Sequence, residues 1–184
     1  MSPAAGGAGG ESRLPEPVRP TEVEEVFAGP LFRVEVQRWF DPNRRRDVVR
    51  HPGSAAVLVL TGEGNVILVR QLREAVGERL LEAPAGIFDR EQEPGHELAR
   101  RELEEETGYR ATRLEHLGTI YTSPGFTDEA IELFLAEAEP GGQPEEGIEM
   151  VAMEFGEAVA AVVDGRIRDA KTALAILLAR ARIT

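Results

Sequence analysis

Apolar residues fall in short, β-rich runs over much of the chain. Residues 54–60 (SAAVLVL) and 65–72 (NVILVRQL) are separated by the turn-forming sequence Thr-Gly-Glu-Gly. Two such runs joined by a turn that contains glycine predict a β-hairpin. Further strands are expected at residues 23–27, 32–40, 78–83, 112–122 and 130–136, and a loop is expected at residues 138–147.

A longer periodicity marks three segments as helices. The strongest lies at about residues 94–107, where Pro94 suits the first turn and Gly108 suits the left-handed position after the last turn. Residues 155–163 and 169–183 also have helical patterns, and the second carries a broad apolar face. A β-sheet covered by at least two helices is therefore expected, which is a mixed α/β (α+β) fold.

Composition narrows the class of protein. The chain has 184 residues, 42% of them apolar, which suits one globular domain with a short appendage. Acidic residues outnumber basic ones by 33 to 21, whereas proteins that bind nucleic acid normally have the opposite balance. Cysteine is absent, no apolar run is long enough to span a bilayer, and residues 1–20 lack the features of a secretory signal. We therefore expect a cytoplasmic protein with no membrane or nucleic-acid partner, and a disordered tail at residues 1–20.

The helix at residues 94–107 carries a high density of acid. On a helical wheel Glu105 and Glu106 fall within about 60° of Glu102, whereas Arg101 is placed on the opposite side. Three like charges at this spacing repel one another, and turning them toward the protein increases the repulsion unless a cation is present. The spacing alone does not distinguish between two explanations of these charges, a bound divalent cation and a surface of salt bridges. Carboxylate ligands would select Mg²⁺, Mn²⁺ or Ca²⁺ over zinc or copper.

The segment that contains these glutamates resembles the Nudix box. That motif runs Gly, five residues, Glu, seven residues, then Arg-Glu-apolar-any-Glu-Glu-any-Gly-apolar. Its second half is complete at residues 101–109 (RELEEETGY), and seven residues separate Glu93 from Arg101. The first half differs, because six residues lie between Gly86 and Glu93, and this departure leaves the detailed role of Glu93 open.

The resemblance implies both a fold and a set of roles. The fold would be a mixed β-sheet packed between helices in an α-β-α sandwich, with an N-terminal antiparallel strand extension. The activity would be a hydrolysis that needs Mg²⁺, with Mn²⁺ as a substitute. Arg101 would support catalysis by orienting the glutamates, and Gly86 would allow a close approach of backbone and metal. The implied main metal ligands are Glu102, Glu106 and the carbonyl of Ala85. Glu105 would act in catalysis as a further ligand or as a partner of Arg101.

Two flanking segments are similar to the ADP-ribose pyrophosphatase group of this family. Residues 69–86 (VRQLREAVGERLLEAPAG) resemble its Gln-aromatic-Arg and Glu-Leu-Pro-Ala-Gly stretches, and residues 123–129 (SPGFTDE) resemble its downstream loop. The similarity implies hydrolysis of ADP-ribose to AMP and ribose 5-phosphate. The implied catalytic base is Glu129, with Asp128 as the alternative. The implied substrate contacts are Arg70, Arg73, Glu82, Pro124 and Phe126.

Several alternatives stay open at this point. Arg70 and Arg73 are also what a solvent-exposed strand edge would carry, and residues 123–129 could form a simple turn. The substrate could be another nucleotide sugar or dinucleotide, such as a GDP-sugar, FAD or NADH. A catalytically silent nucleotide-binding sensor is less favoured, because all the box glutamates are present. The resemblance also implies a homodimer, in which residues 21–50 form a strand region that contacts the partner and residues 51–184 form the Nudix domain.

Overall fold

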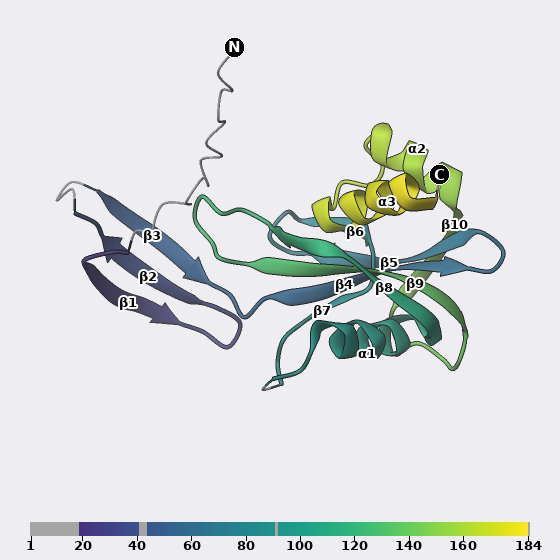
Figure 1. Ribbon diagram of the computed structural model, residues 1–184, viewed down its shortest axis with the longest axis horizontal. Coiled ribbons are helices and arrows are strands. Elements are labelled where there is room, and N and C mark those ends of the chain that lie inside the picture. Colours follow the sequence, from purple (N-terminus) through teal and green to yellow (C-terminus); the bar gives the residue numbers. More distant parts are fainter. Residues whose placement is uncertain (1–18, 41–43, 91, 184) are drawn as a thin grey trace, which may run out of the picture.

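Three helices and ten strands are seen in the computed structural model, which describes residues 19–40, 44–90 and 92–183 (Figure 1). The strands are β1 (Glu22–Ala28), β2 (Arg33–Arg38), β3 (Arg45–Arg50), β4 (Ser54–Thr61), β5 (Asn65–Arg73), β6 (Glu78–Glu82), β7 (Ala85–Ile87), β8 (Tyr109–Tyr121), β9 (Ala130–Pro140) and β10 (Glu149–Glu154). The helices are α1 (Gly95–Thr107), α2 (Phe155–Val163) and α3 (Ala170–Ile183).

The first three strands form a separate antiparallel sheet with the order β1-β2-β3. Figure 1 shows this sheet standing out from the rest of the molecule, joined to it where β3 runs into β4. Every residue of β1 is exposed, so this strand contributes no side chain to the buried core. The N-terminal antiparallel extension that the sequence predicted is therefore confirmed as a structural element.

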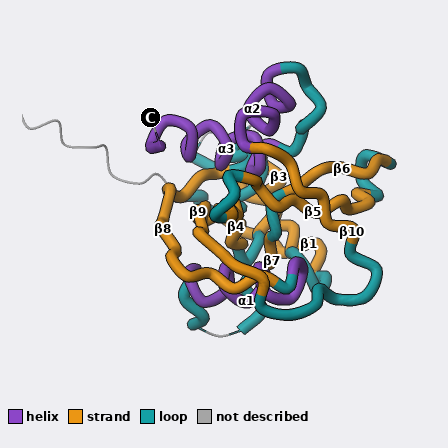
Figure 2. The backbone as a smooth tube through the Cα atoms, turned by 90° about the vertical axis from the view of Figure 1, so that its right-hand side faces the viewer, coloured by secondary structure: helices purple, strands orange, loops and turns teal. Residues whose placement is uncertain are grey.

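The larger sheet has seven strands and forms the middle layer of a sandwich. Its main order is β10-β5-β4-β9-β8, with β6 paired to β5 and β7 paired to β4. Strands β4 and β9 are parallel, and the neighbouring pairs are antiparallel, so the sheet is mixed. Helix α1 covers one face, and α2 and α3 cover the other (Figures 1 and 2). The predicted α-β-α sandwich is confirmed.

Alternation along β4 and β5 divides the core between the two faces, because successive side chains of a strand point to opposite sides. Leu58 and Leu68 pack with the buried face of α3, whereas Val57 and Ile67 pack under α1. Both strands are thus apolar on both faces, as expected for strands at the centre of a covered sheet. This two-sided core holds α1 rigidly against the edge of β7, and the candidate site lies at that contact.

Most of the expected elements are present, and the expected β-hairpin is among them. The hairpin of β4 and β5 has Gly64 in the left-handed region, at φ +83°. Pro94 is the N-cap residue of α1 and not part of its first turn. The segment at residues 138–147 is a loop only in part, because β9 continues to Pro140. The short strands β7 and β10 were not predicted, because they are held by pairing with β4 and β5 and their own sequences favour a strand only weakly.

The expected tail at residues 1–20 lies outside the described residues except for positions 19 and 20. Among the helices that the structure describes, none is long and apolar enough to cross a membrane.

Candidate active site on helix α1

Helix α1 presents its carboxylates at a fixed place because its apolar side is locked into the core. Leu98 and Leu103 are fully buried against the sheet. The helix ends at Gly108, whose φ of 70° is a left-handed conformation that favours glycine and whose N–H donates to the carbonyl of Glu104. The neighbouring glutamates therefore lie at the border between the core and solvent, facing β7.

Glu102 packs directly against Gly86 of β7. A Cβ atom at Gly86 would lie 2.1 Å from the carboxyl carbon of Glu102 and 2.2 Å from its Oε1 atom. Only glycine leaves room for the carboxyl group in this position. Burial raises the pKa of Glu102, and the negative charges of Glu105, Asp89 and Glu93 add to that rise against the opposing charge of Arg101.

Glu106 is the most buried carboxylate of the helix, with 9% of its surface exposed. It accepts hydrogen bonds from Nε2 of Gln71 at 2.8 Å and from the backbone N–H of Ala85 at 3.2 Å. Burial raises its pKa to about 7, and the charge of Glu102 contributes in the same direction. Gln71 was not among the predicted site residues. The signal was present, since Gln71 lies two residues before Arg73 on β5 and therefore shares its face of the sheet.

The backbone of Ala85 faces Glu106. In the antiparallel pairing of β4 with β7, the N–H of Val57 donates to the carbonyl of Pro84, and Gly86 lies opposite Ala55. Ladder bonds alternate along an antiparallel strand, so the N–H and carbonyl of Ala85 point away from β4. The bond from Ala85 N–H to Glu106 has this direction, which is consistent with the carbonyl oxygen of Ala85 lying on the same side.

Arg101 connects the remaining acids. Its guanidinium contacts Glu102 at 2.8 Å, Glu105 at 3.2 Å, Glu93 at 3.2 Å and Asp89 at 3.1 Å. Its side chain is only 16% exposed, because it reaches from its position on the helical wheel to Glu102 and Glu105. The long side chain folds back over the acids because their charge outweighs the cost of burying it. The charge of these acids, above all the hydrogen bond to Glu93, raises the pKa of Arg101.

The donor set fits a hard divalent cation in part. Glu102, Glu105 and Glu106 share one side of α1, and burial raises the pKa of Glu102 and Glu106 and so disfavours their charged forms. A cation would remove that penalty. Among the described residues, however, no three acidic or histidine side chains already stand in a ligating arrangement. Arg101 holds Glu102 and Glu105, so binding of a cation requires these two carboxylates to exchange partners.

Two of the predicted substrate contacts pair with protein groups in the structure. Glu82 is 1% exposed, and its two oxygens accept hydrogen bonds from Arg73 and Lys171. Arg70 forms an ion pair at 2.8 Å with Glu149, which lies directly opposite it on β10. Strand alternation places Arg70 on the other face from Gln71 and Arg73, and its surface role is the better interpretation.

Arg73 lies beside the helix carboxylates. It forms a two-point contact with Glu82, at 2.7 Å from Nε and 2.6 Å from Nη2, and its side chain is 44% exposed. The hydrogen bond to Glu82 raises the pKa of Arg73, and the charges of Asp169 and Glu106 contribute. Arg73 is thus anchored on one side, close to Glu106, and has further N–H groups for an anion on the other.

The loop between β8 and β9 carries the predicted base. Ser123 accepts hydrogen bonds from the N–H groups of Phe126 and Thr127, which confirms a turn, and Phe126 is 56% exposed. Asp128 is tied down at both oxygens, by the N–H of His51 and by Arg50 at 2.9 Å each. Burial alone would raise its pKa, but these two bonds lower it.

Glu129 is held less tightly than Asp128. One oxygen accepts a hydrogen bond from the hydroxyl of Thr122 at 2.8 Å, and the other lies 3.8 Å from Nδ1 of His51. Its side chain is 29% exposed. Of the two acids of the loop, Glu129 therefore has fewer fixed contacts at its side chain.

A hollow of about 510 Å³ lies between the N-terminal sheet and the larger domain. It adjoins the acidic site, because Asp89 lines it and also contacts Arg101. The other side chains that line it are of mixed character, and they include Leu31, Arg33, Arg50, Phe88 and Asp128. Apolar side chains and arginines together suit a ligand with both a flat apolar part and negative charge.

Comparison with known proteins fits this geometry. Residues 49–174 match the model of the NUDIX domain. The chain belongs to the Nudix family. An ADP-ribose pyrophosphatase of Bacillus subtilis (strain 168) is 38% identical over 162 residues, covering 83% of this chain and 87% of the relative. This Nudix chain is also similar to a GDP-mannose pyrophosphatase of Cronobacter sakazakii (strain ATCC BAA-894), at 42% identity over 71% of this chain and 74% of the relative.

One more relative and one solved structure are also similar to this chain. A methanol dehydrogenase activator of Bacillus methanolicus is 35% identical over 84% of this chain and 88% of the relative. The solved structure titled "Crystal structure of ADP compounds hydrolase" superposes with a TM-score of 0.73 and covers 90% of this chain and 94% of that one, at 24% identity. The structural match shows that the fold is the Nudix fold. The sequence matches show an enzyme family whose members carry several names.

Proposed function

We propose that this Nudix enzyme hydrolyses the diphosphate of a nucleoside-diphosphate compound, and that ADP-ribose is its substrate. The observation that carries the proposal is the position of Arg73, an anchored phosphate-binding group, beside the buried carboxylate Glu106 and its neighbour Glu102. The relative named ADP-ribose pyrophosphatase supports the choice of substrate. Water would add to one phosphorus, the bridging P–O bond would break, and AMP and ribose 5-phosphate would leave.

Mg²⁺, with Mn²⁺ as a substitute, is the proposed cofactor. Glu102, Glu105, Glu106 and the carbonyl of Ala85 would hold it, and Gly86 leaves the space in which Glu102 lies. When bound, the cation would neutralise charge on the phosphates and increase the acidity of the attacking water. Arg101 would orient the glutamates from its contact with Glu93, while Glu102 and Glu105 exchange their contact with Arg101 for one with the cation.

Side chains of the protein would bind the phosphate and accept the proton of the attacking water. Arg73 would bind a phosphate oxygen with the N–H groups that do not contact Glu82, which is the usual role of a guanidinium at a diphosphate. Glu129 would take the proton of the attacking water, because Asp128 is fully engaged by His51 and Arg50. Phe126 and Pro124 would contact the substrate from the same loop.

A homodimer is proposed from the exposed apolar surface of the N-terminal sheet. Val23, Phe27, Leu31 and Phe32 are between 36% and 50% exposed, and the rings of Phe27 and Phe32 lie 5.6 Å apart. Monomeric proteins rarely leave a patch of this kind open to water. Sedimentation of the wild-type chain at twice the monomer mass, and of Phe27→Glu at the monomer mass, would support this. The proposed location is the cytoplasm, consistent with a chain that contains no cysteine.

The test is a substrate panel. The full chain is incubated with Mg²⁺ and separately with ADP-ribose, GDP-mannose, FAD and NADH, and products are identified by mass spectrometry. AMP and ribose 5-phosphate from ADP-ribose are expected, and reactions in ¹⁸O-labelled water would show which phosphate receives the new oxygen. Turnover of GDP-mannose alone would replace the proposed substrate. No product from any compound would refute the proposed activity and favour a nucleotide sensor, and Glu102→Gln serves as the inactive control.

A further inference from the structure

The first turn of α3 carries a charge cluster that the Nudix chemistry described above does not use. Lys171 contacts Oε2 of Glu82, and its Nζ atom lies 3.0 Å from Oδ1 of Asp169. Glu82 in turn makes the two-point contact with Arg73. We propose that Lys171 is a positioning residue, which acts through Glu82 to set the orientation and effective charge of Arg73 at the diphosphate site.

The cluster is built into the structure and is not a pair of surface charges. Glu82 is 1% exposed, Lys171 12% and Asp169 16% at their side chains. A buried carboxylate is tolerated only when charges and hydrogen bonds surround it. Burial alone would raise the pKa of Glu82, but Arg73 and Lys171 together lower it, so the carboxylate is ionised between two cations.

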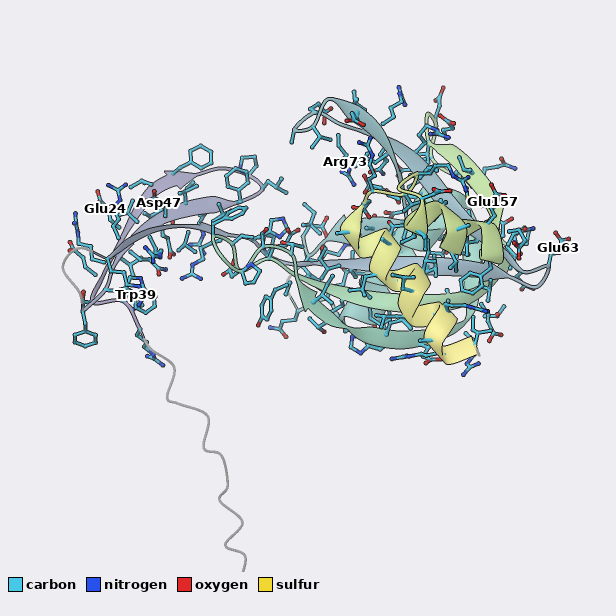
Figure 3. The ribbon with its side chains drawn as sticks, turned by 90° about the horizontal axis from the view of Figure 1, so that it is seen from above. Glu24, Trp39, Asp47, Glu63, Arg73 and Glu157 are labelled. Carbon is cyan, nitrogen blue, oxygen red and sulfur yellow. The ribbon has the colours of Figure 1, made fainter. Side chains whose placement is uncertain are left out.

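Helix α3 is fixed to the strand that carries Glu82. Asp169 caps the helix by accepting a hydrogen bond at 2.9 Å from the N–H of Thr172. The hydroxyl of Thr172, which is fully buried, accepts a hydrogen bond at 2.7 Å from the N–H of Ala83. Ala83 follows Glu82 directly, so the start of α3 determines where Glu82 lies. Figure 3 labels Arg73 near the first turn of α3, to which Glu82 and Lys171 connect it.

Charge balance explains why Lys171 matters to a phosphate ligand. The positive charges of Arg73 and Lys171 balance the negative charges of Glu82 and Asp169. Without Lys171 the group carries a net negative charge next to Glu106, whose charge also acts on Arg73. Arg73 would then be the only counter-ion of a buried carboxylate, and its guanidinium would be drawn toward Glu82 and away from a diphosphate. The inference rests on the proposed function, because it takes Arg73 to be the group that binds phosphate.

Lys171→Met tests the proposal, with Lys171→Gln and Lys171→Arg beside it. The loss of one charge-assisted contact predicts a KM for ADP-ribose that is raised about tenfold or more, with kcat within about threefold of wild type. Lys171→Arg keeps the charge and should recover most of the affinity, although the two side chains differ in shape. If Lys171→Met does not fold, Lys171→Gln, which keeps a hydrogen-bond donor but not the charge, decides the question.

Arg168→Met is the matched control. This substitution removes one positive charge near the same end of α3. Arg168, however, pairs with Glu78 at the surface, where its side chain is 56% exposed. This variant should keep the wild-type KM. An equal rise in KM for Arg168→Met would overturn the proposal, since the effect would then be one of overall charge. An unchanged KM in Lys171→Gln and Lys171→Met would also overturn it.

A second measurement does not depend on turnover. The Nε–H signal of Arg73 in a ¹H–¹⁵N spectrum, assigned by its loss in Arg73→Lys, reports the hydrogen bond to Glu82. It should shift in Lys171→Gln and stay in place in Arg168→Met. If the wild-type protein hydrolyses none of the four compounds of the substrate panel, the proposed function is refuted. The Arg73 signal still tests whether Lys171 acts on Arg73 through Glu82. A signal that does not move in Lys171→Gln would overturn the link even in an active enzyme.

Discussion

Replacing Gly86 by alanine should disable the site without unfolding the protein. The added Cβ would lie 2.1 Å from the carboxyl carbon of Glu102, whereas carbon atoms in contact sit about 3.5–4.0 Å apart. The carboxyl group must therefore move by about 1.5 Å, which is many times the tolerance of about 0.2 Å for a metal–ligand distance. The backbone at Gly86 is not left-handed, so alanine brings no conformational penalty of its own there.

The expected magnitude follows from this displacement. An error of about 1 Å in a reacting group lowers activity roughly a hundredfold, and loss of support around a ligand weakens metal binding by about tenfold to a hundredfold. Mn²⁺ affinity, measured by electron paramagnetic resonance, and kcat/KM for ADP-ribose should both fall by such factors in Gly86→Ala, while the melting temperature stays close to that of wild type.

Gly62→Ala provides the control for this prediction. Gly62 lies in the turn between β4 and β5, its φ is not in the left-handed region, and no atom would lie within 4 Å of an added Cβ. This variant should match wild type in all three measurements. If Gly86→Ala bound Mn²⁺ as tightly as Gly62→Ala and turned over substrate at the same rate, Glu102 would not be a metal ligand.

Three further outcomes are expected. Arg73→Gln should lower kcat/KM about tenfold to a hundredfold by loss of a charge-assisted phosphate contact, whereas Arg70→Gln should leave it within about twofold, and equal losses would contradict the assignment of faces on β5. Glu129→Gln should lower kcat sharply with an unchanged melting temperature, and wild-type turnover would remove Glu129 from the role of base. In metal-free protein the pKa of Glu106, about 7, lies above its ordinary value of 4.5, so the folded state holds a proton that the unfolded state releases. The contribution of Glu106 to the free energy of unfolding should therefore fall by up to about 3 kcal/mol as the pH rises from 4.5 to 7. In denaturant titrations, the free energy of unfolding should fall less steeply over this range in Glu106→Gln than in wild type.

Much of the fold could be predicted because it follows from local pattern. The run from Ser54 to Leu60 is apolar on both faces and can be stable only inside a covered sheet, and residues 94–108 combine helical spacing with a glycine at the left-handed position. The same local pattern placed Glu102, Glu105 and Glu106 on one side of α1. Strands β7 and β10 escaped prediction, because each is stabilised by a partner strand that is distant in the sequence.

The sequence by itself determined which residues carry charge on α1 and that they must share a side, since 3.6 residues per turn is a property of the backbone. Only the tertiary structure decided what faces them. Burial of Glu82 between Arg73 and Lys171, the contact of Gln71 with Glu106, and the turning of Arg70 to the other face all depend on how β5, β6 and α3 pack together. These contacts join residues up to 89 positions apart, and the energy of an ion pair depends on burial, which is a property of the folded molecule and not of the chain.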